Sequence, residues 1–449
     1  MKAKIVLSLL GIAAVLGGLA AQQSAQSDII GKITKGERAA IAIPDFRGAG
    51  GTQPLMSAFN ETLFREVQNA GIFKMTPKSM MPLQNPQRPQ DFEGGRRGTG
   101  LTLLDWSSPP AAANYLAFGY AAEQGGQLSL YGWMFNVNQP DISNAQVIGK
   151  VYFGTLDEAG ARKVAQEFAS DILSQFGATS LVGSKVYYVS QRGSVKEIWQ
   201  MNYDGSDQKP FSGYKSISTM PNVAPDGSKI AFTTFARGNP SIAVHSLETG
   251  RRLPFYNQQA SMNATPSFTP DGKMILFSST LSGIAQIYAA NVDGSGLRRI
   301  SNVRAIEVEP KVNPRNANEI VFVSGRSGPQ QIYKMNLDGA DVIRLTTGEG
   351  EASNPSWHPD GQHIAFAWTR GFEPGNWNIF IMDVATRETV QLTHGRGRNE
   401  NPSWSPDGRH LVFSSNRSGT NQIWTMLADG TQAVQLTSQG INQMPVWSK

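Results

Sequence analysis

The chain has 449 residues, no cysteine and 46 glycines, which is about a tenth of the total. Average glycine usage is nearer ~7%, so the chain is rich in turns. The absence of cysteine excludes disulfides, thiolate metal sites, cysteine nucleophiles and a lipidated N-terminal cysteine. The net charge of +5 at pH 7 is small for this length and gives no indication of nucleic-acid binding.

The N-terminal residues 1–21 have the pattern of a secretory signal peptide. Lys2 and Lys4 form a short positive segment, and Ile5 to Ala21 is an uncharged, mostly apolar run that ends in small residues. We expect cleavage at about residues 20–25. The alternative is a membrane anchor, for which this run is marginally short.

A repeat of about 45 residues fills the C-terminal 60% of the chain. Pro-Asp-Gly begins at Pro225, Pro270, Pro359 and Pro406, and Pro314-Arg315-Asn316 is a degenerate copy. A short apolar run follows each copy, and Val186-Tyr187-Tyr188 is the same run one period earlier. The sequence therefore contains six repeats.

Each repeat contains four short strand-like segments separated by turn residues, which is typical of a β-propeller blade. The repeat region begins with a second segment, at Gly183, and the chain ends with a lone first segment, Gln443 to Lys449. The C-terminal segment can therefore complete the first blade and remove exposed strand edges. We predict a six-bladed β-propeller over residues 183–449, closed by the C-terminal strand.

Residues 28–177 lack the repeat and mix strand and helix patterns. Apolar residues at helical spacing predict helices over Leu55 to Ala70 and Glu158 to Phe176. A strand is expected at residues 39–44 and a hairpin around Gly125-Gly126, with a long loop over residues 75–110. The predicted fold class is mainly β: a six-bladed β-propeller preceded by a small α/β domain.

No catalytic motif stands out in the sequence. There is no nucleophile elbow, no phosphate-binding loop and no HExxH helix. The histidines show no acidic partners at metal-ligand spacing, and His363 and His410 share one repeat position, which favours a structural or surface role. We therefore predict no enzyme activity, no cofactor and no metal.

One ring of positions is a candidate binding site at the mouth of the propeller channel. The residues before the first-segment prolines are Met220, Thr265, Glu309, Asn354, Asn401 and Met444. The loop between second and third segments carries Arg192, Arg237, Arg326, Arg370 and Arg417, with Leu281 in the remaining repeat. These groups either receive a protein segment or, in the case of the arginines, tie adjacent blades together.

The repeat motif at Asn401 to Gly408 reads Asn-Pro-Ser-Trp-Ser-Pro-Asp-Gly. It resembles the motif of the TolB-type propeller repeat family of Gram-negative envelopes. The order of signal peptide, α/β domain and six repeats is similar to that family over nearly the whole mature chain. The resemblance implies a non-enzymatic, monomeric periplasmic protein of the Tol-Pal system, which supports outer-membrane integrity and cell division. Its implied partners are the peptidoglycan-associated lipoprotein Pal, inner-membrane TolA-like proteins and other outer-membrane proteins.

The resemblance also implies site residues. Glu309 and Glu400 match the family pattern at the mouth, and Asn263 lies in the loop that contacts Pal. Beside it, Met262 stands where the family commonly has histidine. The N-terminal residues Asp28, Ile29 and Ile30 lie where the family contacts its Tol partners.

Two other functions remain open from the sequence. One is a propeller-type hydrolase or the regulatory half of a peptidase, which would need a nucleophile-bearing domain. The other is a propeller that binds a glycan or small ligand in its channel, which a bound sugar in a native preparation would favour.

Overall fold

The computed structural model describes residues 29, 31, 38–92, 100–371, 375–395 and 397–449. It divides into two compact units. One unit is Gly36–Val182, and the other contains Gly183–Lys449 together with Ile29 and Gly31. The predicted signal peptide lies outside the described residues. Among the residues that are described, no helix is long and apolar enough to cross a membrane.

The smaller unit is built on a mixed sheet. Its strands are β1 (Ala39–Ala42), β2 (Arg47–Gly48), β3 (Phe73–Met75), β4 (Tyr115–Gln124), β5 (Gln127–Asn136) and β6 (Gln146–Thr155). The sheet order is β3-β1-β4-β5-β6, with β2 paired to β4. The pairs that β1 makes with β3 and β4 are parallel, whereas β4, β5 and β6 form an antiparallel meander.

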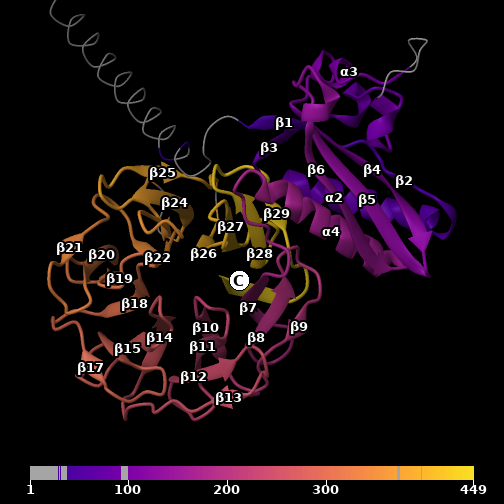
Figure 1. The fold of residues 1–449 in the computed structure, drawn as a ribbon. Helices are drawn as coiled ribbons and strands as arrows, with labels where there is room; N and C mark the ends of the chain where they lie inside the picture. The colour runs from indigo at the N-terminus through magenta and orange to yellow at the C-terminus, as the bar shows by residue number, and fades with distance from the viewer. Residues whose placement is uncertain (1–28, 30, 32–37, 93–99, 372–374, 396) are drawn as a thin grey trace, which may run out of the picture. The chain divides into compact units, whose positions relative to one another are not determined.

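Two helices, α2 (Met56–Asn69) and α4 (Glu158–Ser174), pack together against this sheet (Figure 1). The α4 helix begins where the Asp157 carboxylate accepts the backbone N–H of Gly160 at 2.7 Å, an N-cap that satisfies a free donor of the first turn. Its side chains Phe168 and Ile172 are buried on the face that faces the sheet. Both predicted helices and the predicted hairpin are confirmed.

Two parts of this unit differ from the sequence prediction. The third antiparallel strand, β6, was not predicted. The expected long loop at residues 75–110 contains the short helical turns η2 (Lys78–Met80), η3 (Pro89–Phe92) and α3 (Leu104–Ser107). These turns form because Phe92 and Trp106 are buried with Phe118 and Phe135 on the second face of the sheet. Two further short turns are η1 (Gly50–Leu55) and η4 (Ile142–Asn144).

The larger unit is a six-bladed β-propeller in the described part of the chain, as predicted. Five blades follow one another along the chain, each with four strands in sequence order. The first two contain β10 (Ser218–Val223), β11 (Lys229–Thr234), β12 (Ser241–Ser246) and β13 (Arg252–Leu253), and then β14 (Asn263–Phe268), β15 (Met274–Ser279), β16 (Gln286–Asn291) and β17 (Arg298–Arg299). The next three contain β18 (Glu307–Val312), β19 (Glu319–Ser324), β20 (Gln331–Asn336) and β21 (Ile343–Arg344); β22 (Ala352–Trp357), β23 (His363–Trp368), β24 (Asn378–Asp383) and β25 (Thr389–Gln391); and β26 (Asn399–Trp404), β27 (His410–Ser415), β28 (Gln422–Leu427) and β29 (Val434–Gln435). The sixth blade has the order β30-β7-β8-β9, from β30 (Ile441–Ser448), β7 (Lys185–Gln191), β8 (Glu197–Asn202) and β9 (Lys209–Pro210).

The ring is closed by the pairing of the last strand with the first. β30 runs antiparallel to β7, with Trp447 opposite Val186 and Ile441 opposite Gln191, and the C-terminus marked in Figure 1 lies beside β7. The indole Nε1 of Trp447 donates to Ser184 Oγ at 3.0 Å, which joins the two ends of the propeller by a side-chain hydrogen bond. β7 is therefore paired on both sides, with β30 and with β8.

The expected role of the Asp-Gly turns is also confirmed. Gly294 follows Asp293 in the turn between β16 and β17 with φ of 86°. A Cβ at this position would lie 2.4 Å from the carbonyl oxygen of Tyr256, so both the backbone conformation and the close approach require glycine.

The closing strand generates a stability prediction. Trp447→Ala removes a buried indole and its hydrogen bond from the strand that joins the ends of the ring. Truncation of a buried aromatic side chain commonly costs ~3–5 kcal/mol, and we expect the free energy of unfolding to fall by about that amount. Guanidinium unfolding followed by circular dichroism measures the change.

The matched control is Ile441→Ala on the same strand, where the side chain is 42% exposed. Surface substitutions of this kind usually change stability by less than about 0.5 kcal/mol. Equal effects of the two substitutions would show that burial of the closing strand does not hold the ring together.

Candidate functional site

The inner strand of each blade carries a bulge at the residue before its proline. In β14, for example, the register with β15 shifts between Ala264 and Ser267. The bulge residues all have left-handed backbone φ angles of 52–55°: Met220, Thr265, Glu309, Asn354, Asn401 and Met444. Such a conformation costs a non-glycine residue of order 1–3 kcal/mol, so the surrounding structure must hold it in place.

All six bulge side chains line one cavity of about 270 Å³, which is the central channel of the ring. The structure therefore brings together the predicted residues Met220, Thr265, Glu309, Asn354 and Asn401. The four polar side chains, Thr265, Glu309, Asn354 and Asn401, lie on four consecutive blades. The remaining two bulge side chains, Met220 and Met444, are apolar.

Hydrogen bonds connect the polar side of the channel from blade to blade. Glu309 Oε2 accepts the backbone N–H of Asn354 at 2.8 Å, and Asn354 Oδ1 accepts the backbone N–H of Asn401 at 3.3 Å. Each of these side chains thus satisfies the backbone donor of the next bulge. The network explains in part how the left-handed conformation is held at Asn354 and Asn401.

The channel also contains two charged groups with shifted pKa values. Burial raises the pKa of Glu309 above its ordinary value, even though the bonds from Asn354 and the charge of Lys311 act in the opposite direction. Burial lowers the pKa of Lys311, against the opposing effect of Glu309. Both residues lie on β18 and face the channel, so neither charge is well solvated there.

Three predicted mouth residues lie outside the channel lining. Asn263 is only 2% exposed, and its amide donates to the carbonyl of Gln258 at 2.9 Å, so it orders the loop before β14. Met262, next to it, is half-buried. Glu400 forms a two-point ion pair with Arg398, with N–O distances of 2.8 and 2.9 Å.

Of the three predicted N-terminal contact residues, Asp28 and Ile30 lie outside the described residues. Ile29 is fully buried in an apolar cluster that includes Ile379 and Trp404. Because these come from the β22–β25 and β26–β29 blades, Ile29 packs where two neighbouring blades meet. No pattern in the sequence indicates this contact.

The arginines of the loops between second and third strands do not tie adjacent blades together in the contacts the structure shows. Arg326 pairs with Glu307 and lies 5.0 Å from the ring centre of Tyr333, both in its own blade. Arg417 donates to Asn399 Oδ1 at 2.8 Å and lies over Trp424, again within one blade. These arginines therefore brace the strands of single blades.

The histidines differ from the sequence prediction. The turn between β22 and β23 brings His358, Asp360 and His363 together, with potential ligand atoms within 4.8 Å of one another. The pattern His-Pro-Asp-Gly-Gln-His was visible in the sequence. It was missed because the Pro-Asp-Gly turn accounts for the aspartate without any further role.

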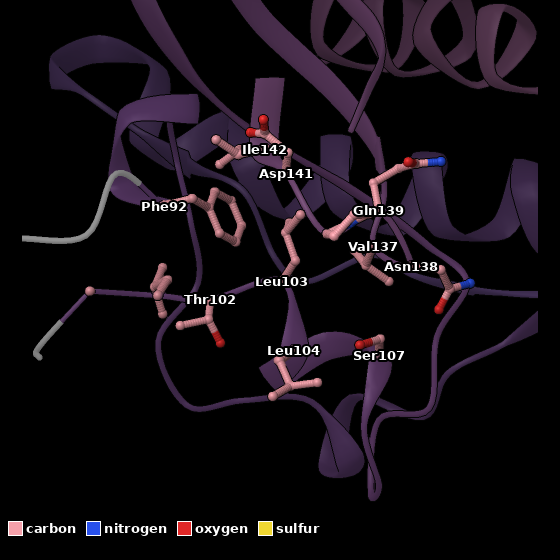
Figure 2. A pocket seen from close by; sticks show the side chains of 13 residues that line it. Phe92, Thr102, Leu103, Leu104, Ser107, Val137, Asn138, Gln139, Asp141 and Ile142 are labelled. Atoms are coloured by element: carbon pink, nitrogen blue, oxygen red, sulfur yellow. The ribbon is translucent and has the colours of Figure 1, made fainter. Parts of the chain in front are cut away.

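The smaller unit has a pocket of about 780 Å³, shown in Figure 2. Phe92, Leu103 and Val137 supply much of its apolar wall. The Asp141 carboxylate at its rim accepts the backbone N–H of Ser143 at 3.0 Å and so serves as a helix cap. The channel, with its convergent polar side chains, is the stronger candidate site.

Comparison with known proteins places the repeats in a family. A model of the TolB β-propeller domain matches residues 176–371 and 348–449, which together make up more than half of the chain. The chain belongs to the TolB β-propeller family. All six blades of the structure lie within the matched residues.

Individual relatives agree with this assignment. The chain is 29% identical over 214 residues to a protein TolB homolog of Chlorobium chlorochromatii, covering 47% of this chain and 45% of the relative. It is 29% identical over 224 residues to the Tol-Pal system protein TolB of Desulfosudis oleivorans, covering 48% and 47%. The chain therefore spans about half the length of these relatives.

A solved structure extends the likeness in fold. The crystal structure of TolB from Acinetobacter baumannii matches with a TM-score of 0.73 and 21% sequence identity, over 92% of this chain and 97% of the other. At this identity the match shows the fold alone. It covers both the α/β unit and the propeller.

The raised pKa of Glu309 gives a testable pH dependence. The folded protein binds this proton more tightly than the unfolded chain, so stability falls as pH rises from the ordinary glutamate pKa of ~4.3 through the raised value. Glu309→Gln keeps an acceptor for Asn354 without the charge. We expect the variant to be more stable than the parent at pH 7, with the difference closing below about pH 4.

Urea unfolding at a series of pH values measures this difference. Glu319→Gln is the control, because it removes a carboxylate from a partly exposed ion pair with Lys334 worth ~0–1 kcal/mol. A Glu309→Gln variant that is less stable than the parent at every pH would contradict the prediction.

Proposed function

We propose that the chain is the TolB component of a Tol-Pal system. In this role it is exported to the periplasm, binds a Pal-like peptidoglycan-associated lipoprotein and links it to inner-membrane, TolA-like proteins. The observation that carries the proposal is the match of the propeller repeats to relatives named Tol-Pal system protein TolB. The proposed consequence is support of outer-membrane integrity and cell division.

Exposed apolar side chains at the mouth of the channel support this proposal. Exposed aliphatic side chains occur before or at the start of the inner strands and between the second and third strands: Ile217, Leu281, Ile284, Ile306 and Ile441. In an antiparallel blade these segments lie at the same end. Apolar groups gathered at one end favour a protein partner over a soluble small ligand.

We propose that Pal contacts this end through Met262 and Glu400. Asn263 holds the Met262 loop from beneath, and Glu309 and Asn354 fix the backbone of the inner strands. In the same proposal the segment Asp28–Ile30 contacts the Tol partner. Because Ile29 is buried against the propeller, a contact made by its side chain requires Ile29 to leave its place between the two blades.

The proposal predicts a specific loss of binding. Glu400→Ala removes a charged group that the partner would desolvate, and truncating such a group commonly costs ~2–5 kcal/mol. We expect the affinity for the Pal-like lipoprotein of the same organism to fall by about 30-fold or more. Titration calorimetry with the two purified proteins measures the change.

Lys273→Ala is the control, since Lys273 is exposed in the turn between β14 and β15, at the opposite end of the blade. Its binding is expected to equal that of the parent. Normal binding by Glu400→Ala would refute the mouth assignment, and absence of any binding to Pal by the parent protein would refute the proposed function.

A further inference from the structure

A cluster of imidazole and carboxylate groups lies in the β22–β25 blade, at the end opposite to the channel mouth. The Nδ1 atoms of His358 and His363 lie 2.9 and 2.8 Å from the same carboxylate oxygen, Asp360 Oδ2. On the other side of His363, Nε2 lies 3.9 Å from Asp383 Oδ2 and has no hydrogen-bond partner. The imidazoles are buried, whereas the Asp360 side chain is 31% exposed.

The hydrogen bonds of His358 place an unprotonated imidazole nitrogen next to the Asp360 carboxylate. Its Nε2 lies 2.8 Å from the carbonyl oxygen of Gly408, which can only accept, so Nε2 carries the proton. Its Nδ1 accepts the backbone N–H of Asp360 at 3.1 Å and therefore presents a lone pair. That lone pair faces the Asp360 carboxylate at 2.9 Å, an arrangement that is repulsive unless a cation lies between the two.

The neighbouring blade shows how the same turn is neutralised elsewhere. In the β26–β29 blade, Asp407 pairs with His410 at 2.9 Å, as Asp360 pairs with His363. There, however, the guanidinium of Arg409 lies 3.1 Å from the same carboxylate oxygen, and Ser405 takes the position of His358. In the β22–β25 blade the position of Arg409 is occupied by the uncharged Gln362.

The turn itself does not require these residues. The position of His358 is filled in the other repeats by Ala224, Thr269, Asn313 and Ser405, and the position of Asp383 by Asn202, Ser246, Asn291, Asn336 and Leu427. Within the described residues, the two histidines and two carboxylates occur together in this blade alone. The propeller fold alone therefore does not explain why these four side chains occur together in the β22–β25 blade.

We propose that His358, Asp360 and His363 bind one divalent transition-metal ion of the zinc class, with Asp383 as the outer partner of His363. Two imidazole nitrogens and one carboxylate oxygen, with one coordination position left for water, are typical of zinc. Oxygen-seeking ions such as Ca²⁺ and Mg²⁺ do not favour this donor set. Metal-binding imidazoles usually donate their outer nitrogen to a protein acceptor, as His358 does to Gly408, and the nearest carboxylate oxygen to the outer nitrogen of His363 is that of Asp383 at 3.9 Å.

Binding of the ion requires the side chains to adjust. Ligand atoms of a tetrahedral zinc site lie about 3.3 Å apart when the metal–ligand distance is ~2.0 Å. The present separations from Asp360 Oδ2 are 2.8 and 2.9 Å, and all three ligand atoms lie within 4.8 Å of one another. The ion would take the lone pair of His358 Nδ1 that now accepts the Asp360 N–H. The exposed edge of Asp360 provides the path for the ion and the position for water.

The test uses the full chain without a histidine tag, stripped with a chelator and titrated with ZnCl₂ against a chromophoric competitor. We expect one equivalent of zinc to bind and to raise the melting temperature. His358→Asn is expected to weaken binding at least tenfold. It should fold, because Asn313 occupies the same position in the preceding blade and donates to Gly361 in place of the His358–Gly408 contact.

Two further variants make the test decisive. His363→Met introduces the residue that β15 carries at this position, Met274, and is expected to lose zinc in the same way. His410→Asn in the neighbouring blade is the control and is expected to bind zinc as the parent does. Substitution by Co²⁺ reports the coordination geometry through its visible absorption bands.

Failure of the parent to bind zinc would overturn the proposal. Zinc binding that survives both His358→Asn and His363→Met would also overturn it, since the ion would then lie elsewhere. Neither result bears on the Tol-Pal role, which is tested at the other end of the blades.

Discussion

The pairing of β30 with β7 is the constraint on which the propeller depends. Each blade buries its faces against its two neighbours, so the ring is complete only when the last blade meets the first. Because the chain has no cysteine, no disulfide can hold the ends together. The backbone ladder from Ile441 to Ser448 and the hydrogen bond from Trp447 to Ser184 do this instead, across 263 residues of sequence. A chain that lost this strand would expose an unpaired edge in the first blade.

The same ring geometry determines what the channel can contain. Six inner strands converge, and a bulge in each turns one side chain toward the axis in a left-handed conformation. That conformation is unfavourable for glutamate or methionine, yet glycine would remove the side chains that line the channel. Glu309 and Asn354 meet part of the cost by accepting the backbone N–H of the next bulge. The channel residues are therefore constrained by the backbone of their neighbours as well as by any partner.

The sequence predicts the parts of this structure that repeat. The Pro-Asp-Gly turns, the apolar runs and the incomplete first and last copies are enough to predict the blades and their closure. The strand β6 was missed because Gln146–Thr155 buries few side chains, contains two glycines and lacks a clear apolar alternation. The burial of Ile29 was also beyond prediction, because it depends on a groove between blades that forms only in three dimensions. The arginine ring was recognised as a repeat feature, but only the coordinates show that Arg326 and Arg417 brace their own blades.

The two ends of the blades can be interpreted by opposite arguments. At the turn end, one chemical solution recurs: the aspartate of Pro-Asp-Gly accepts the backbone N–H two residues on, at 2.9 Å in Asp226, 2.7 Å in Asp360 and 2.9 Å in Asp407. A single blade that adds two imidazoles and a second carboxylate to this common turn departs from a structural baseline, and the departure itself points to a ligand. At the mouth end the six bulge positions vary instead, since they carry four residue types that differ in charge and polarity around the ring. An asymmetric lining in a symmetric backbone suits an asymmetric partner, because a folded protein surface presents different groups to each blade, whereas a small symmetric ligand would not distinguish them.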